Sequence, residues 1–492
     1  MRNCLHRLLF LVLLPLLAIP QAARAGDEPV LLLQSSSGTY DLDGERRLII
    51  EEITGTLSLR AATNDTIRFE GRSLGSERDL QEVALWREGD NTLLLGPAAE
   101  VPAEGTLVDM LLPEGLDVEV FLVGGRLLVS AIGGDLRVEA ENSKIQARGL
   151  LDDAEFRLTG GVLTVDGVKG DFSVKGSGVQ VDLQHLYGSA ELDLTEGRAK
   201  LDAAELDVQV TSDQTDLEFS RVKGELRVDS SGGSLHVSGC TGGGELQLEE
   251  TTLALLSSKG DFTVRTDAMM EFGLHEGSLR VLGYGASIQG NQIAGPLFVE
   301  NSSSSVTLKQ LSGKTEIRGT ELKLTVEDSK GPLDIHLVSS DVTLRRVDAT
   351  VLVENQFGDI QTSETKTGLT ITSSGGNVQV ANHQGPLEIR ADGPEVRVGW
   401  SKFTKYDTMK VRNATGDIYL GLPATGRCNL QVKARFGRVD VGTTGIQVSD
   451  DGHSVGGEYT GGRAKAPQVK KPNLQVVSGG GNVYIGTASA TD

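Results

Sequence analysis

The sequence predicts an all-β chain folded as a single-stranded β-helix, or β-solenoid, with about 18 residues per coil and a β-rich cap at each end. Three observations predict this fold: a glycine period, apolar residues that alternate along the chain, and the absence of long helical patterns. Among the 492 residues, 62 are glycine and only 4% are aromatic. The period consists of glycines spaced by multiples of 18, with one step of 17 before Gly277: Gly134, Gly170, Gly188, Gly224, Gly242, Gly260, Gly277, Gly295, Gly313, Gly331 and Gly385.

Each interval between these anchor glycines contains two short apolar patterns. Positions two and four after an anchor are apolar, as with Leu297 and Val299, whereas Phe298 between them is expected to face outward. A second apolar pattern precedes the next anchor, as with Val306 and Leu308. A spacing of two is typical of a strand that buries one face. We expect the anchor glycine to supply a backbone shape that a side chain would forbid.

The period divides the chain into four predicted parts. Residues 1–25 form a signal peptide, 26–115 an N-terminal β cap, and 116–400 the regular solenoid. Residues 401–492 form irregular coils and a C-terminal cap, with a glycine-rich loop at 451–472. Caps are expected because the open ends of a solenoid expose strand edges.

The first residues have the organisation of a secretory signal. Arg2 and Arg7 precede an apolar stretch at 8–19, and Ala23 and Ala25 form a small-x-small cleavage site. The apolar stretch is short for a membrane span, although an uncleaved anchor is the alternative. We therefore expect an exported protein, located in the periplasm, at the cell surface or outside the cell, with no membrane insertion after cleavage.

The charge balance excludes some partners. The chain has 68 acidic and 47 basic residues, a net charge of −21. Such acidity disfavours binding to nucleic acids and to anionic membranes. Of the cysteines outside the signal peptide, Cys240 and Cys428 lie about ten coils apart, too far for a disulfide, so we expect two free thiols with Cys240 buried.

Three segments resemble a known family. They are Leu-Leu-Pro-Glu-Gly-Leu-Asp-Val-Glu-Val at 111–120 followed by Gly-Asp-Leu-Arg-Val at 134–138, Gly-Asp-Ile-Tyr-Leu-Gly-Leu-Pro at 416–423, and the glycine run before Asn-Val-Tyr-Ile at 482–485. With them the chain resembles the bacterial "putative adhesin" family of β-strand-repeat proteins, whose functions are largely unassigned. The resemblance implies an exported, right-handed β-solenoid.

The search for chemistry predicts no catalytic residue, no cofactor and no metal site. The histidines show no metal-ligand spacing, and His275 and His383 occupy inward positions. A carbohydrate-active β-helix enzyme would need carboxylates stacked on one face. The outward acids are scattered along the rod and are interpreted as a solvated face: Asp135, Asp171, Asp261, Glu225 and Glu245.

One aromatic and basic cluster is unusual in this aromatic-poor chain. Trp400, Phe403 and Tyr406 alternate with Lys402 and Lys405. The cluster is a candidate platform for a glycan or a protein. The alternative is a cap where the regular coils end.

The sequence as a whole favours an exported, non-enzymatic β-solenoid that serves as a cell-envelope or surface scaffold, with adhesin-like binding of a glycan or a protein. Two alternatives remain, a polysaccharide lyase or hydrolase with a β-helix fold and a periplasmic partner in envelope sensing. The sequence does not indicate an oligomeric state.

Overall fold

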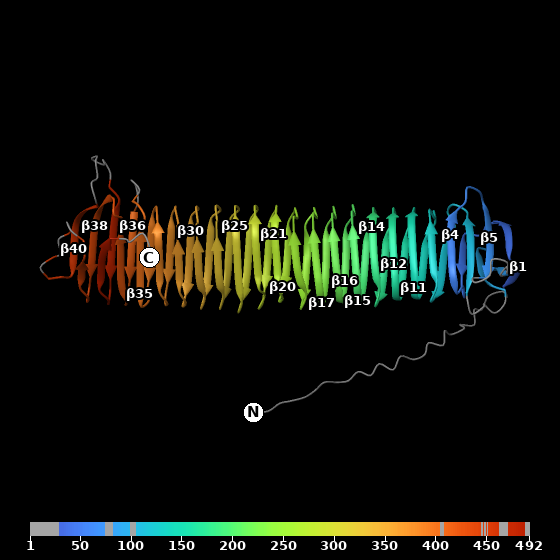
Figure 1. Ribbon diagram of the computed structural model, residues 1–492, viewed down its shortest axis with the longest axis horizontal. Coiled ribbons are helices and arrows are strands. Elements are labelled where there is room, and N and C mark those ends of the chain that lie inside the picture. Colours follow the sequence, from blue (N-terminus) through green and yellow to red (C-terminus); the bar gives the residue numbers. More distant parts are fainter. Residues whose placement is uncertain are drawn as a thin grey trace, which may run out of the picture.

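The structure is a computed structural model that describes residues 29–73, 82–98, 105–403, 408–443, 446, 449, 451–461 and 471–487. These residues form a rod of about 17 turns whose strands run across its long axis (Figure 1), which confirms the predicted all-β solenoid. No helix long and apolar enough to cross a membrane occurs among them. The predicted signal peptide, residues 1–25, lies outside the described residues.

The regular array stacks parallel strands in register. Partners such as Leu136 and Ala154 lie one coil apart, which confirms the predicted period. The predicted shorter step is confirmed at Phe262 and Leu279. The strands of this array are β11 (Leu136–Leu150), β12 (Ala154–Val168), β13 (Phe172–Ser177), β14 (Gln180–Leu186), β15 (Ala190–Asp202), β16 (Val208–Ser220), β17 (Leu226–Ser238), β18 (Gly244–Glu249), β19 (Thr252–Leu256), β20 (Phe262–Thr266), β21 (Met270–His275), β22 (Leu279–Gly283), β23 (Ile288–Ile293), β24 (Leu297–Ser302), β25 (Ser305–Leu311), β26 (Thr315–Thr320), β27 (Lys323–Glu327), β28 (Leu333–Val338), β29 (Asp341–Arg345), β30 (Val351–Gln356), β31 (Ile360–Ser363), β32 (Leu369–Ser373), β33 (Val378–His383), β34 (Leu387–Ala391) and β35 (Glu395–Trp400).

The core follows the alternation expected from the sequence. Leu297 and Val299 are buried, while Phe298 lies outside with the Arg280 guanidinium 4.3 Å from its ring centre. Several polar side chains inside the rod donate hydrogen bonds to backbone carbonyls. The Asn301 amide donates to the Ala286 carbonyl at 2.7 Å, so this buried residue of an Asn-Ser-Ser sequence is not an accessible glycosylation site.

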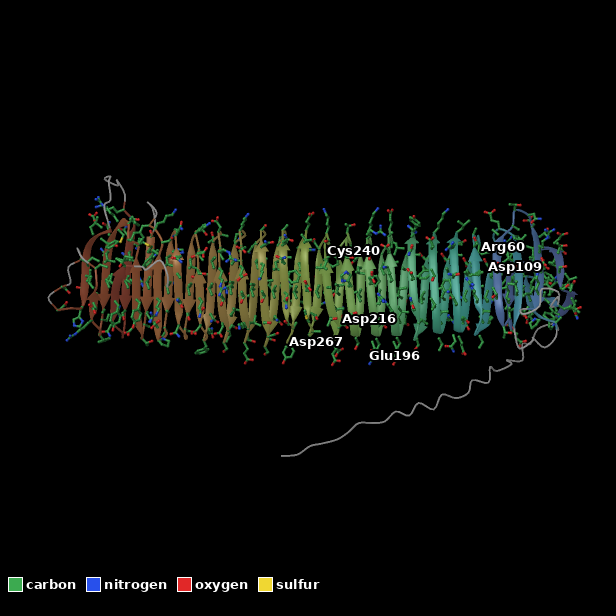
Figure 2. All side chains as sticks on the ribbon, in the orientation of Figure 1. Arg60, Asp109, Glu196, Asp216, Cys240 and Asp267 are labelled. Carbon is green, nitrogen blue, oxygen red and sulfur yellow. The ribbon has the colours of Figure 1, made fainter. Side chains whose placement is uncertain are left out.

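Two corners of the coil are turned by residues in the left-handed backbone region. Successive members of one corner lie one coil apart, as in Asp328, Arg346 and Glu364, with φ of 57°, 52° and 56°. The second corner includes Ser339 and Phe357, with φ of 52° and 65°. The two columns follow the long edges of the rod; Glu196, another member, is at one edge in Figure 2.

The anchor glycines have the expected backbone shape at some positions and a different role at most of them. Gly242, Gly260, Gly277 and Gly385 have left-handed φ values between 105° and 133°, as expected, whereas the other anchors, including Gly313 and Gly331, have ordinary φ values. A Cβ at Gly313 would lie 2.0 Å from the Gly295 carbonyl oxygen, and one at Gly331 would lie 1.9 Å from the Gly313 oxygen. The expectation of an unusual backbone shape was therefore wrong for these positions: the glycines allow adjacent coils to approach closely.

The N-terminal part adds antiparallel strands to the stack. The space order on one face is β1–β6–β7–β3–β9, and on the other β2–β5–β8–β4–β10. The strands β6 and β7 pair antiparallel as a hairpin. The strands are β1 (Val30–Ser35), β2 (Ser37–Asp41), β3 (Arg47–Ile50), β4 (Gly55–Ala61), β5 (Thr66–Ser73), β6 (Val83–Glu88), β7 (Thr92–Pro97), β8 (Thr106–Leu112), β9 (Asp117–Val123) and β10 (Arg126–Ser130).

The C-terminal part stacks its coils out of chain order. The coil β36/β37 follows β34/β35, then comes β41/β42, and β38/β39 lies beyond it. The strand β40 pairs antiparallel with β38, so the predicted loop at 451–472 was wrong where this strand forms. The strands are β36 (Thr408–Asn413), β37 (Asp417–Leu422), β38 (Gly426–Ala434), β39 (Val439–Val441), β40 (Ser454–Gly461), β41 (Asn473–Ser478) and β42 (Val483–Thr487).

Both cysteines outside the predicted signal peptide are free and Cys240 is buried, as expected, and Cys428 is buried as well. Burial raises the pKa of the Cys240 thiol, and burial raises the pKa of Cys428 to about 12. Since the thiolate is the reactive form, both side chains are chemically inert parts of the core at neutral pH.

Candidate functional site

The predicted aromatic platform does not form as a single exposed surface. Trp400 is only 1% exposed at the end of β35, and its ring centre lies 5.9 Å from that of half-buried Phe403. Lys402 is exposed, whereas Lys405 and Tyr406 lie outside the described residues. Trp400 is therefore not a ligand contact, because its indole belongs to the core, and its burial favours the alternative interpretation of a cap where the regular coils end.

The position of this cluster explains why the period breaks there. Leu387 pairs with Met409, which lies further along the chain than one regular coil would place its partner. The extra residues follow Trp400, at the point where β35 ends. The break in the 18-residue period after Trp400 therefore corresponds to a coil with extra residues.

The outward acids near the N-terminal end form a column rather than a scattered face. Asp117, Asp135, Asp153 and Asp171 occupy the same position in successive coils. Their carboxylates accept backbone N–H groups of the next coil: the Asp135 N–H donates to Asp117 at 3.1 Å, and the Asp171 N–H donates to Asp153 at 2.7 Å. Further along the rod, Asp261 accepts the Ser278 N–H at 2.8 Å. These acids therefore satisfy amides at a corner.

The column lines a shallow groove of about 640 Å³ together with paired charges. Arg137 bonds Glu155 at 2.9 Å across neighbouring coils. The carboxylates of Asp135, Asp152 and Asp153 lie within 4.8 Å of one another. Burial, followed by repulsion from neighbouring aspartates, raises the pKa of Asp135. The cluster is exposed and its members are engaged in the corner, so the geometry alone assigns no metal or catalytic role.

Ion pairs along the rod use many of the remaining outward charges of the regular coils. Lys309 bonds Glu327 at 3.3 Å, and Arg345 lies 3.7 Å from the same carboxylate. At the adjoining corner, Arg346 bonds Asp328 at 2.6 Å. Similarly, Arg60 and Asp109 pair at 3.6 Å in the N-terminal cap (Figure 2). Such exposed pairs stabilise each contact only weakly.

A second groove at the C-terminal end differs from the rest of the surface. Its ridge is formed by Arg397, Tyr419, Tyr484 and Asp440, which are register partners on β35, β37, β42 and β39. The two tyrosine rings stack with their centres 4.7 Å apart and their planes 11° apart. The Arg397 guanidinium lies 4.4 Å from the centre of the Tyr419 ring. We call this set the tyrosine ridge.

The tyrosine ridge is held in place from both sides. Two-point hydrogen bonding to Glu395 raises the pKa of Arg397, which keeps its guanidinium charged and fixed over the ring. Burial, the largest effect, raises the pKa of Tyr419. The Asn482 amide donates to the Tyr484 hydroxyl at 3.4 Å. The ridge is therefore an ordered arrangement of two phenols and one cation.

Beside the ridge runs a column without side chains. Gly399, Gly421 and Gly486 are register partners, and the Gly442 N–H bonds the Ile485 carbonyl next to them. In earlier coils this column holds side chains, which are Ala381 and Ser363 in the two preceding coils and Arg345 before them. The ridge and this glycine floor enclose a groove of about 470 Å³.

Sequence reasoning missed this groove, although a signal was present. Positions 417–421 read Asp-Ile-Tyr-Leu-Gly, and 482–486 read Asn-Val-Tyr-Ile-Gly. The repeated tyrosine and glycine at the same spacing identify two coils with the same outward pattern. Their stacking could not be read from the sequence, because the partners lie several coil lengths apart along the chain.

Comparison with known proteins gives little further information. No family model and no curated protein matches the chain. A solved structure described as a "putative cell adhesion protein" from Clostridium sporogenes aligns with 94% of this chain and 100% of its own, at 10% identity and a TM-score of 0.14. A likeness at that TM-score carries no argument, and the family resemblance of the sequence stays a prediction.

Proposed function

We propose that this protein is an exported, non-enzymatic scaffold of the cell envelope or cell surface that binds a partner in an adhesin-like manner. The observation that carries the proposal is the difference between the outward side chains of the regular coils and those of the C-terminal end. Over the regular coils, outward charges pair between coils and the corner acids satisfy backbone amides. At the C-terminal end, two tyrosines and a glycine floor instead line an open groove.

The rod itself suits a structural role. Every coil pairs with its neighbours, so the core is continuous and the two ends are held far apart (Figure 1). A binding groove at one end of such a rod would be displayed at a distance from whatever holds the other end. Export is supported by the signal pattern of residues 1–25.

Protease shaving of intact cells tests this function. Cells that make the protein are treated with protease, and the rod is detected with antibodies beside a periplasmic control protein. Loss of the rod while the control survives is expected for a surface scaffold. Protection until the outer envelope is permeabilised would support a periplasmic scaffold, and detection only in the cytoplasm would overturn the proposal.

The non-enzymatic part of the proposal has its own test. Purified protein is incubated with acidic and neutral polysaccharides, and viscosity and new reducing ends are followed over time. No change is expected. Release of reducing ends that is abolished in Asp135→Asn or Asp171→Asn would instead favour the carbohydrate-active enzyme.

A further inference from the structure

We propose that the groove beside the tyrosine ridge binds a neutral, linear glycan that lies along the rod axis. The inference rests on the proposed function and names the partner of that surface. Four observations support it. They are the tyrosine ridge, a floor of glycines that folding does not require, the pairing of the floor strands with one another, and the charge of the residues that line the groove.

The floor glycines Gly399, Gly442 and Gly486 are not needed for the backbone. Their φ values are ordinary, and a Cβ at Gly486 would meet nothing within 4 Å. A Cβ at Gly399 would come no closer than 3.8 Å to the Val380 oxygen, which is an ordinary contact. The anchor Gly331 differs, because its Cβ would lie 1.9 Å from a carbonyl oxygen. Since glycine weakens a strand and often marks the close approach of a ligand, the floor glycines keep space open.

Most of the floor backbone is already used along the rod. The strands β35, β37 and β42 are paired in parallel on both edges, and β39 pairs with β42 at the end of this face. A ligand that lies along the rod axis therefore crosses paired strands, and over β35, β37 and β42 it finds no free edge to which a peptide could add as a strand. Recognition has to use side chains, which suits a ligand rich in hydroxyl groups.

The side chains of the groove offer the matching hydrogen-bonding groups. Because the rings of Tyr419 and Tyr484 stack along the rod axis, their edges and hydroxyls, not their faces, are turned toward a ligand in the groove. Gln379 and Asn382 line the same groove with amide donors and acceptors. Phenol and amide groups of this kind bind both as donors and as acceptors, as sugar hydroxyls require.

The charge of the lining selects against acidic sugars. Arg397 is the cation of the groove lining, and it is already paired with Glu395. Asp440 is exposed and makes no ion pair or side-chain hydrogen bond within the described part of the chain. The whole chain carries −21. A uronic-acid polymer would therefore be repelled, whereas a neutral glycan would not.

The dimensions fit a short stretch of a flat glycan. The four floor glycines span three coil steps, or about 14 Å at about 4.8 Å per step. A β-1,4-linked chain forms a flat ribbon with equatorial hydroxyls, which matches a floor without side chains and a hydroxyl-bearing ridge. We therefore expect about three sugar units to make contact at a time.

The test is calorimetric titration of the full-length mature protein with three hexasaccharides. Cellohexaose and chitohexaose are the neutral probes, and hexagalacturonate is the acidic one. Gly486→Gln fills the floor at a position where an added Cβ would meet nothing within 4 Å, and Tyr484→Ala removes one ring of the ridge. The matched controls are Gly456→Gln, where a Cβ also meets nothing within 4 Å, and Tyr284→Ala at an exposed tyrosine elsewhere.

We expect at least one neutral hexasaccharide to bind saturably, with affinity lowered at least about tenfold by Gly486→Gln and by Tyr484→Ala and unchanged in both controls. Melting temperatures should identify any variant that fails to fold, and Gly486→Gln is expected to melt with the wild type. Failure of both neutral probes to bind, stronger binding of hexagalacturonate, or unchanged binding by folded Gly486→Gln would overturn the inference.

The glycan titration and the tests of the proposed function can fail independently of each other. A rod that is shaved from the cell surface but binds none of the neutral probes leaves the scaffold function intact and refutes the glycan. A rod that binds a probe and releases reducing ends from it retains the glycan site and refutes the non-enzymatic function.

Discussion

Replacing an anchor glycine by alanine should separate two neighbouring coils. At Gly313 the added Cβ would lie 2.0 Å from the Gly295 carbonyl oxygen and 2.3 Å from its carbon. Ordinary C···O contacts are about 3.3 Å or longer, so the coils would have to part locally by about 1.3 Å. Because each coil is fixed from above and below, we expect a local loss of about 3 kcal/mol, at the upper end of overpacking effects.

The measurement is native-state hydrogen exchange on the strands that flank the substitution, because global unfolding of a long repeat array need not be two-state. A loss of about 3 kcal/mol corresponds to exchange about a hundredfold faster in β24–β26. The control is Gly399→Ala, whose Cβ has no contact shorter than 3.8 Å. Equal exchange in the two variants would refute the explanation of the anchors by close approach.

Three further predictions concern corners, core and pH. Leu274→Gly should stabilise the rod by about 1 kcal/mol, because this exposed leucine has φ of 53°, and a lower melting temperature would contradict this. Leu297→Asp should melt several coils, whereas Phe298→Asp should lose only the packing with arginine; equal circular-dichroism melting curves would show the register to be wrong. Burial lowers the pKa of His275, so its neutral form stabilises the fold fully above about pH 6.5, the unfolded value, and this contribution is lost as the pH falls toward the folded value. The melting temperature should therefore decline below about pH 6.5 less steeply in His275→Gln than in the wild type, and parallel curves would exclude this histidine.

The sequence was sufficient for the fold because the coil repeats a local pattern. The alternation around Leu297 and the spacing of the glycines each reflect a contact that recurs once in every coil. The corners were less visible, since residues as different as Glu321 and Phe357 adopt the same left-handed conformation. Position in the repeat, and not residue type, decides the backbone there.

The candidate groove could not be predicted for a different reason. It depends on Tyr419 and Tyr484 being adjacent, and that adjacency depends on the out-of-order stacking of the last coils. The role of Trp400 was left open between a platform and a cap, because a large aromatic residue beside lysines looks the same in sequence whether it fills an enlarged coil or faces a ligand. The burial of Trp400 distinguishes these two possibilities, and burial can be seen only in the folded rod.

The stacking order at the C-terminal end also constrains how the rod is completed. The strands β38 and β39 are made before β41 and β42, yet they rest on them in the finished stack. Until residues 473–487 have been synthesised, the edge of β36/β37 stays open and β38 has no parallel neighbour. The antiparallel pair β38–β40 can join the stack only after β41 and β42 have paired with β36 and β37. Completion of the groove beside the tyrosine ridge therefore requires β42, which carries Tyr484 and Gly486, so a rod that lacks β42 would have no complete groove.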